Sequence, residues 1–309
     1  MNKEILEELI LNINSRTGIR NDILEKDYYV CLVLKELASK QKELQAYFKG
    51  GTAVYKILAH MNRFSEDIDL TVKMNENESN NSNKTRLKKS ALGYSIDGLL
   101  LVDDETIDKK GSITSFYKYD SLFSLNELFK LERIQIEATS FTVSEPVSTY
   151  TIEPLVYKYA TEEEKSILKE KYNISEFEIE IIKLERIFID KIFAAEFYYE
   201  REMYEDVSKH LYDISIMIEN NDIKELLKNK SELSKLIGYK RKEEKSRIGG
   251  IPEDKDIIDF DYMKLEFSDD LINAFNKMQR IYVMDNESVI TIDDVKETIK
   301  ILLDVFRNL

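Results

Sequence analysis

The chain has 309 residues, of which 43% are hydrophobic and 34% charged, so it has a globular composition and a length that favours two domains. Its 45 basic and 59 acidic side chains give a net charge of −14 at pH 7, which argues against a general nucleic-acid coat or an anionic-membrane binder. A local basic patch is still compatible with this balance.

Cysteine and histidine content limits the chemistry further. The single cysteine, Cys31, excludes an internal disulfide, and its apolar neighbours predict a buried, inert thiol. Two histidines without a cysteine pair argue against zinc, so any metal is expected to be a hard cation held by carboxylates. No signal-peptide pattern and no apolar run of about 18 residues is present. We therefore expect a cytoplasmic protein with no membrane partner.

The first part of the chain is predicted to mix helices and strands. Three segments have helical periodicity or composition: residues 5–13, 24–37 and 53–60. Three others are predicted to be extended: residues 65–72, 113–119 and 133–142. The polar, low-complexity stretch 75–83 cannot fill a core and is predicted to be a flexible loop.

From Ser175 onward, strand signals nearly vanish and helical periodicities replace them. A helix is predicted from Ser175 to Tyr199, a second from Glu205 to Glu219, and others as far as Leu309. We place a domain boundary near residue 170. The expected fold is α+β, with a mixed-sheet domain over residues 1–170 followed by an α-helical domain over residues 171–309.

Two motifs in the first part suggest phosphate and metal chemistry. The turn Gly50-Gly51-Thr52 precedes a predicted helix, where backbone N–H groups and the helix N-terminus favour a phosphate. Asp67 and Asp69 follow on an extended segment, so both carboxylates point to one face, with Cα atoms about 7 Å apart. An edge strand with a solvated acidic face is the alternative interpretation. Together, the motifs suggest a triphosphate at the glycines and Mg²⁺ or Mn²⁺ at the aspartates.

A third carboxylate often joins such a pair and activates the attacking hydroxyl. Glu137 is the best candidate, because it lies on the polar face of an alternating strand whose other face carries Ile134, Ile136 and Ala138. An ordinary surface glutamate is an equally compatible interpretation.

These motifs resemble the nucleotide-binding signature of the AbiEii/AbiGii toxin family of nucleotidyltransferases, a branch of the DNA polymerase beta-like superfamily. The matching residues are Gly50-Gly51-Thr52 and the run from Arg63 to Asp69. The upstream segment Glu25-Lys26-Asp27-Tyr28-Tyr29 is similar to one that the family carries before its glycine turn.

Two further elements match in the helical part. Lys191 resembles a lysine typical of the family, and the run from Ser208 to Asp213 resembles its Ser-Arg-His-Tyr-Tyr-Asp-like element, with Lys209 where arginine is common. The resemblance covers residues 25–215. Family members carry this lysine and aspartate as essential site residues.

The resemblance implies a Mg²⁺-dependent toxin of a type IV toxin–antitoxin or abortive-infection system. Its implied reaction transfers a nucleoside monophosphate from an NTP to an RNA acceptor, such as a tRNA 3′ end, and a cognate antitoxin is an implied partner. The implied catalytic residues are Asp67, Asp69, Glu137, Lys191 and Asp213, with Asp67 and Asp69 as metal ligands. The implied nucleotide-binding residues are Gly50, Gly51, Thr52, Ser65 and Lys191.

The helical periodicity around Lys191 gives an argument that does not depend on the family resemblance. It interrupts an apolar helical stripe, where a lysine costs stability unless its ammonium reaches an anion or a cleft; snorkelling to solvent is the alternative. A helix, a short turn and a returning helix would bring Lys191 beside Asp213. His210 is compatible with either an assisting or a structural role.

Some alternatives stay open. The basic run over residues 240–247 fits an RNA-contacting patch or a solvated loop. The same site chemistry would also serve transfer to a small-molecule hydroxyl. A protein of another class, a nucleotide-binding or partner-binding module without turnover, is the third hypothesis.

Overall fold

The computed structural model describes residues 2–58, 63–123, 132–284 and 286–309. Contacts between these residues divide the chain into two units: Met1–Ala59 with Phe64–Ile182, and His60–Arg63 with Lys183–Leu309. Each unit is described separately below.

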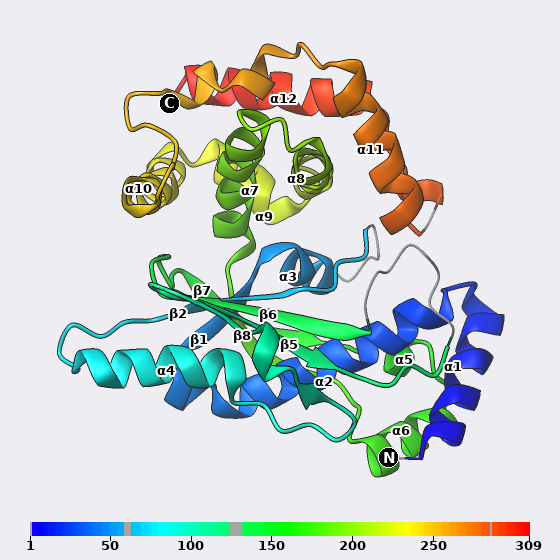
Figure 1. The fold of residues 1–309 in the computed structure, drawn as a ribbon. Helices are drawn as coiled ribbons and strands as arrows, with labels where there is room; N and C mark the ends of the chain where they lie inside the picture. The colour runs from blue at the N-terminus through cyan, green and yellow to red at the C-terminus, as the bar shows by residue number, and fades with distance from the viewer. Residues whose placement is uncertain (1, 59–62, 124–131, 285) are drawn as a thin grey trace. The chain divides into compact units, whose positions relative to one another are not determined.

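The first unit contains a mixed sheet with the strand order β3-β5-β6-β2-β1-β8-β7, and β4 also pairs with β5 (Figure 1). The strands are β1 (Ala46–Lys49), β2 (Ile68–Val72), β3 (Leu100–Leu101), β4 (Ile107–Lys109), β5 (Ser112–Lys118), β6 (Arg133–Thr139), β7 (Val147–Ile152) and β8 (Phe177–Ile182). The pairs β2–β6 and β1–β8 are parallel, and the other pairs are antiparallel.

Helices of the first unit cover the sheet. They are α1 (Lys3–Thr17), α2 (Asn21–Leu44), α3 (Gly50–Ile57), α4 (Asn80–Leu92), α5 (Leu155–Lys158) and α6 (Glu162–Tyr172), with the 3-10 turn η1 (Asp103–Glu105). Ser115 of β5 lies opposite Ile136 of β6, and its hydroxyl donates to the Ala91 carbonyl of α4 at 2.7 Å. The face that carries Ile136 therefore packs on α4, and the next residue, Glu137, points to the opposite face.

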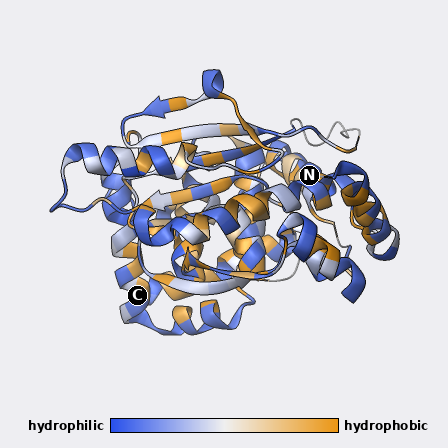
Figure 2. Cartoon of the chain, turned by 90° about the horizontal axis from the view of Figure 1, so that it is seen from below, coloured by the Kyte–Doolittle hydropathy of each residue, from blue (hydrophilic) through white to orange (hydrophobic). Residues whose placement is uncertain are grey.

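Most of the elements predicted in the first part of the chain are confirmed. The first two helices become α1 and α2, and the alternating strand becomes β6, in which Ile134, Ile136 and Ala138 are all buried. Apolar and polar residues also alternate along the strands in Figure 2. Cys31 is buried as predicted, and burial raises the pKa of its thiol to about 12, so the thiol is inert.

One expectation and one alternative interpretation for this region are wrong. The stretch 75–83 is not all loop, because α4 begins at Asn80 after Ser79, whose side chain accepts a hydrogen bond from the Ser82 backbone. The strand that follows Asp67 is not an edge strand, because β2 lies between β1 and β6.

The second unit is helical among its described residues. It contains α7 (Leu184–Tyr199), α8 (Tyr204–Met217), α9 (Asn221–Lys228), α10 (Lys230–Ser246), α11 (Asp269–Tyr282) and α12 (Ile292–Arg307), with the 3-10 turns η2 (Ile257–Asp259), η3 (Asp261–Lys264) and η4 (Asn286–Ser288). No helix in the described part of the chain is long and apolar enough to cross a membrane.

The prediction that a helix begins at Ser175 is wrong for the residues before Leu184. Residues Phe177–Ile182 form β8, in which Ile179 and Ile181 are buried while Glu178 and Glu180 point to the more exposed face. This period of two is that of a strand, and the helix α7 begins only at Leu184. Because β8 pairs with β7 and β1, it belongs to the sheet, and the two units divide between Ile182 and Lys183.

Candidate active site

The glycine turn of the first unit contacts an acidic strand. Gly50 follows β1 directly, has a φ of 82° and begins α3. A Cβ at this position would lie 2.0 Å from Asp69 Oδ2, so both the backbone conformation and the space available require glycine. The first turn of α3, which also contains Gly51, therefore lies against the carboxylate of Asp69.

Carboxylates from two neighbouring strands share one face of the sheet. Asp69 of β2 lies opposite Glu137 of β6 in parallel register, and neighbouring strands are about 4.8 Å apart. Asp67, two residues before Asp69, is exposed, whereas Asp69 and Glu137 are half-buried. The structure thus places Glu137 beside Asp69, and Asp67 lies just before β2. The catalytic roles of all three carboxylates stay predictions.

Thr52 and Ser65 support the segment that precedes β2. Thr52 is fully buried, and its hydroxyl donates to the Asp67 carbonyl at 2.6 Å and lies 3.0 Å from Ser65 Oγ. The hydroxyl of Thr52 therefore fixes the backbone of a candidate metal ligand. The predicted phosphate contacts of Thr52 and Ser65 stay predictions.

Asp69 and Glu137, which lie side by side, offer carboxylate ligands suited to a divalent cation. Their oxygens are the hard donors that Mg²⁺ and Mn²⁺ prefer. The cradle at Gly50, which a Cβ would fill, leaves room for the Asp69 carboxylate at the N-terminus of α3. Asp67 and Asp69 would hold the ion, with Glu137 beside them.

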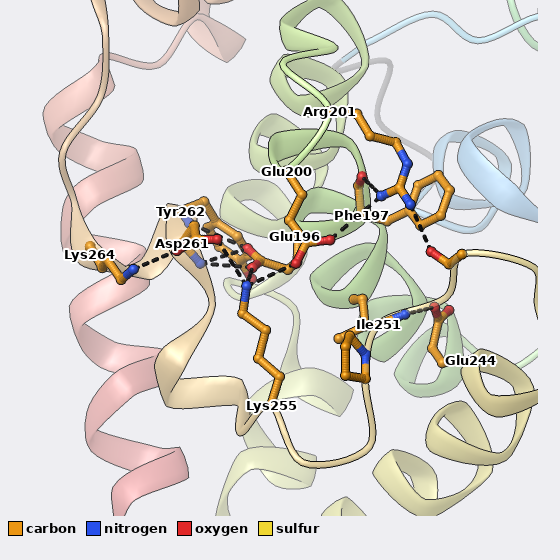
Figure 3. Close-up of polar contacts among 12 residues, drawn as sticks. Glu196, Phe197, Glu200, Arg201, Glu244, Ile251, Lys255, Asp261, Tyr262 and Lys264 are labelled. Atoms are coloured by element: carbon orange, nitrogen blue, oxygen red, sulfur yellow. Dashed lines mark hydrogen bonds and ion pairs between the residues drawn. The ribbon is translucent and has the colours of Figure 1, made fainter.

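A second acidic cluster, in the helical unit, is of a different kind. Oxygens of Glu196, Glu200 and Asp261 lie within 4.8 Å of one another, but the ammonium of Lys255 lies 2.5, 2.9 and 2.9 Å from them (Figure 3). Glu196 also accepts the backbone N–H of Asp261 at 2.8 Å. Lysine already neutralises this cluster, so we interpret it as a structural ion-pair network that attaches η3 to α7.

The helical unit brings together Lys191 of α7 and Asp213 of α8. Lys191 Nζ lies 2.7 Å from Asp213 Oδ2, and both side chains are buried, so the alternative that Lys191 snorkels to solvent is wrong. Arg63, whose role the sequence did not indicate, forms a bidentate pair with the same carboxylate at 2.9 and 2.8 Å. Although burial opposes ionisation of Asp213, Arg63 and Lys191 hold its pKa well below the usual range.

His210 lies next to this charged group. Its ring stacks on Tyr198 with centroids 5.4 Å apart, and its buried Nδ1 has no hydrogen-bond partner among the residues that the structure describes. Burial is the main cause that lowers the pKa of His210 well below 6.5, and the neighbouring cation Lys191 lowers it further. The imidazole is therefore neutral in the folded chain at physiological pH.

This neutral histidine predicts a pH-dependent stability. Below about pH 6.5 the unfolded chain binds a proton at His210 that the folded chain does not, so stability falls as pH falls, by up to about 1.4 kcal/mol per pH unit. His210→Phe, which keeps a ring beside Tyr198, should remove this contribution. Urea unfolding of both proteins between pH 7 and 5 measures it, and parallel pH curves would contradict the assignment.

The basic run over residues 240–247 is largely structural. It forms the last turns of α10 rather than a solvated loop. Lys240 is buried and lies 2.9 Å from Glu244, and Arg241 donates to the Pro252 and Lys255 carbonyls at 3.1 and 2.6 Å. Of the lysines in this run, only Lys242 and Lys245 are exposed. An RNA contact here would therefore rest on few side chains.

The chain matches one family of known proteins and is similar to a solved structure. Residues 32–297 match the family described as "Nucleotidyl transferase AbiEii toxin, Type IV TA system". Among solved structures, the chain is similar to MenT4, the nucleotidyltransferase toxin Rv2826c from Mycobacterium tuberculosis H37Rv, with 10% identity, a TM-score of 0.39, and coverage of 98% of this chain and 99% of that one. No curated protein sequence matches significantly.

Proposed function

The chain belongs to the AbiEii family of nucleotidyltransferase toxins of type IV toxin–antitoxin systems, and from this premise we propose that it transfers a nucleoside monophosphate from an NTP to a hydroxyl of RNA, such as a tRNA 3′ end. Enzymes of this kind generally use a divalent metal; Mg²⁺ or Mn²⁺ is part of the proposal. The single buried thiol supports a cytoplasmic setting.

One observation carries the proposal: Gly50 lies against Asp69, and Glu137 lies opposite Asp69 on the next strand. A helix N-terminus that favours phosphate therefore adjoins carboxylates that favour a divalent cation. Phosphoryl transfer needs this combination, because its catalysis consists mainly of positioning and charge neutralisation.

Each candidate residue has a role in the proposed reaction. The acceptor oxygen bonds to the α-phosphorus of the NTP, the bond to pyrophosphate breaks, and the hydroxyl proton passes to the Glu137 carboxylate. The backbone of Gly50 and Gly51 binds the triphosphate, and Asp67 and Asp69 hold the metal. When bound, that metal neutralises phosphate charge and orients the leaving group.

Residues of the second unit are included on the family resemblance. Lys191 supplies an ammonium for the nucleotide, and Asp213 holds that ammonium in place. A cognate antitoxin that inhibits the enzyme is the proposed protein partner.

The test is a label-transfer assay. Purified full-length chain is incubated with each α-labelled NTP, Mg²⁺ or Mn²⁺, and total RNA. Label in RNA supports the proposal, and label in a small acceptor supports the alternative of small-molecule modification. Absence of transfer with every NTP and acceptor preparation would contradict it and leave a binding module as the better hypothesis.

A substitution at Gly50 tests the proposed site. Gly50→Ala should lower the transfer rate about 100-fold, because the added Cβ must displace the Asp69 carboxylate, and a shift of about 1 Å costs that much. Gly18→Ala is a matched control, since Gly18 has a φ of 72° but no atom lies within 4 Å of the position that a Cβ would take there. Both variants should lose about 1–2 kcal/mol of stability from backbone strain. Equal transfer rates in the two variants would contradict the assignment.

A further inference from the structure

Three consecutive charged residues of α2 are buried. Glu25, Lys26 and Asp27 have relative exposures of 1%, 4% and 0%. Burial of three adjacent charges is costly unless each finds a partner. Successive helix residues point about 100° apart, so each of the three reaches a different neighbouring segment.

The outer two residues attach α2 to loops and helices of the sheet unit. Glu25 accepts hydrogen bonds from the Leu122 backbone at 2.9 Å and from the Ser121 hydroxyl at 2.7 Å. Asp27 accepts the Leu155 backbone N–H at 2.7 Å and also bonds Tyr55 and Lys56. Since Tyr55 and Lys56 belong to α3, Asp27 anchors the helix that begins at the glycine turn.

The middle residue connects the two segments that carry the candidate metal ligands. Lys26 Nζ lies 2.8 Å from Glu66 Oε2 and 2.5 Å from the Arg133 carbonyl. Glu66 immediately precedes Asp67, and Arg133 is the first residue of β6, the strand of Glu137. One buried ammonium thus holds the Asp67 segment and the Glu137 strand at a fixed spacing.

We propose that Lys26 is a positioning residue that sets the spacing between Asp67 and Glu137 for the divalent cation; this inference rests on the proposed function of these carboxylates. Groups that orient metal ligands typically change metal affinity 10–100-fold when they are removed. Lys26 touches neither substrate nor metal in this proposal, and acts through Glu66 and the start of β6.

The direction in which cation affinity changes on removal of Lys26 distinguishes a positioning role from a purely electrostatic one. Removal of a positive charge near a cation site would by itself strengthen cation binding, because Coulomb repulsion is lost. Loss of positioning weakens binding. A purely structural lysine would change stability alone.

The experiment uses the full chain with Lys26→Met, Lys26→Arg and the matched control Lys35→Met. Lys35 lies on the same helix and also donates to a backbone carbonyl, that of Asn173 at 2.7 Å, away from the carboxylate segments. Mn²⁺ binding is followed by electron paramagnetic resonance of the free ion, thermal unfolding gives stability, and label transfer is measured against Mn²⁺ concentration.

We expect Lys26→Met to weaken Mn²⁺ binding 10–100-fold and to raise by a similar factor the Mn²⁺ concentration needed for transfer. Lys26→Arg, which keeps a charged donor, should retain most of the affinity, and Lys35→Met should bind Mn²⁺ as the wild type does. If Lys26→Met fails to fold, Lys26→Gln takes its place in the same comparison.

Two results would overturn the inference: tighter Mn²⁺ binding by Lys26→Met, or binding equal to that of Lys35→Met. If either occurs while the wild type transfers label, only the inference fails. If the wild type binds no Mn²⁺, the carboxylate site and the inference both fail. If it binds Mn²⁺ but transfers no label, the proposed function fails, and the binding comparison still decides the role of Lys26.

Discussion

Asp69→Asn should reduce the rate of nucleotidyl transfer by about 1,000-fold, the upper range for loss of one preorganised charge-stabilising group. Asparagine has nearly the same shape as aspartate, so the contact with Gly50 is retained while the negative charge is lost. Asp69 lies at the centre of the proposed site, beside both the glycine turn and Glu137, so loss of its charge should have a large effect.

The matched control for this prediction is Glu178→Gln. Glu178 is an exposed carboxylate on β8 of the same sheet, and its substitution should leave transfer unchanged. Initial rates with saturating NTP and Mg²⁺ give the comparison, and thermal unfolding shows whether both variants are folded. A folded Asp69→Asn protein that transfers label at the wild-type rate would contradict the metal-ligand assignment.

Local patterns in the sequence predicted the central part of the candidate site. Asp69 shares a face with Glu137 because a strand has a period of two, and Gly50 marks a helix start because only glycine accepts the backbone conformation and the close approach. The alternation around Glu137 predicted that it lies on the face of β6 opposite the buried residues Ile134 and Ile136, as it does. Each of these inferences depends on a few neighbouring residues, whose geometry the sequence determines directly.

Local sequence patterns could not predict which strands pair. The register of Asp69 with Glu137 joins strands that are not consecutive along the chain, so sequence could only suggest Glu137 as a candidate. The strand β8 was taken for helix, because its glutamates alternate with isoleucines over only six residues directly before α7. Its strand conformation is stabilised by pairing with β7 and β1.

Charged residues were the hardest to place from sequence. Arg63 binds Asp213 across a separation of 150 residues. It begins the run that resembles the family signature, but its local sequence does not indicate this partner. Lys26 is likewise buried because Glu66, which is distant along the chain, neutralises it. Burial of a charge is a property of its tertiary partners, so composition and periodicity cannot reveal it.

Asp213→Ala should lower the free energy of unfolding by about 3–5 kcal/mol, the usual cost of breaking a buried ion pair. It would leave two buried cations, Arg63 and Lys191, without the carboxylate that both bind. This is a large part of the roughly 5–15 kcal/mol that stabilises a typical domain. Urea unfolding at pH 7 measures the loss, and a change below 1 kcal/mol would contradict the ion-pair geometry.

Asp206→Ala is the matched control on the same helix. Asp206 is 37% exposed and lies 3.4 Å from Lys209, so its removal should cost less than about 1 kcal/mol, as expected for a surface pair.

The stabilising effect of Asp213 should also depend on pH. The pKa of Asp213 is depressed in the folded chain, so its contribution is present above the unfolded-state pKa of about 3.9 and is lost as pH falls further. The stability difference between wild type and Asp213→Ala should therefore shrink below pH 4, whereas a difference that stays constant down to pH 2 would show that Asp213 stabilises the fold by packing rather than by charge.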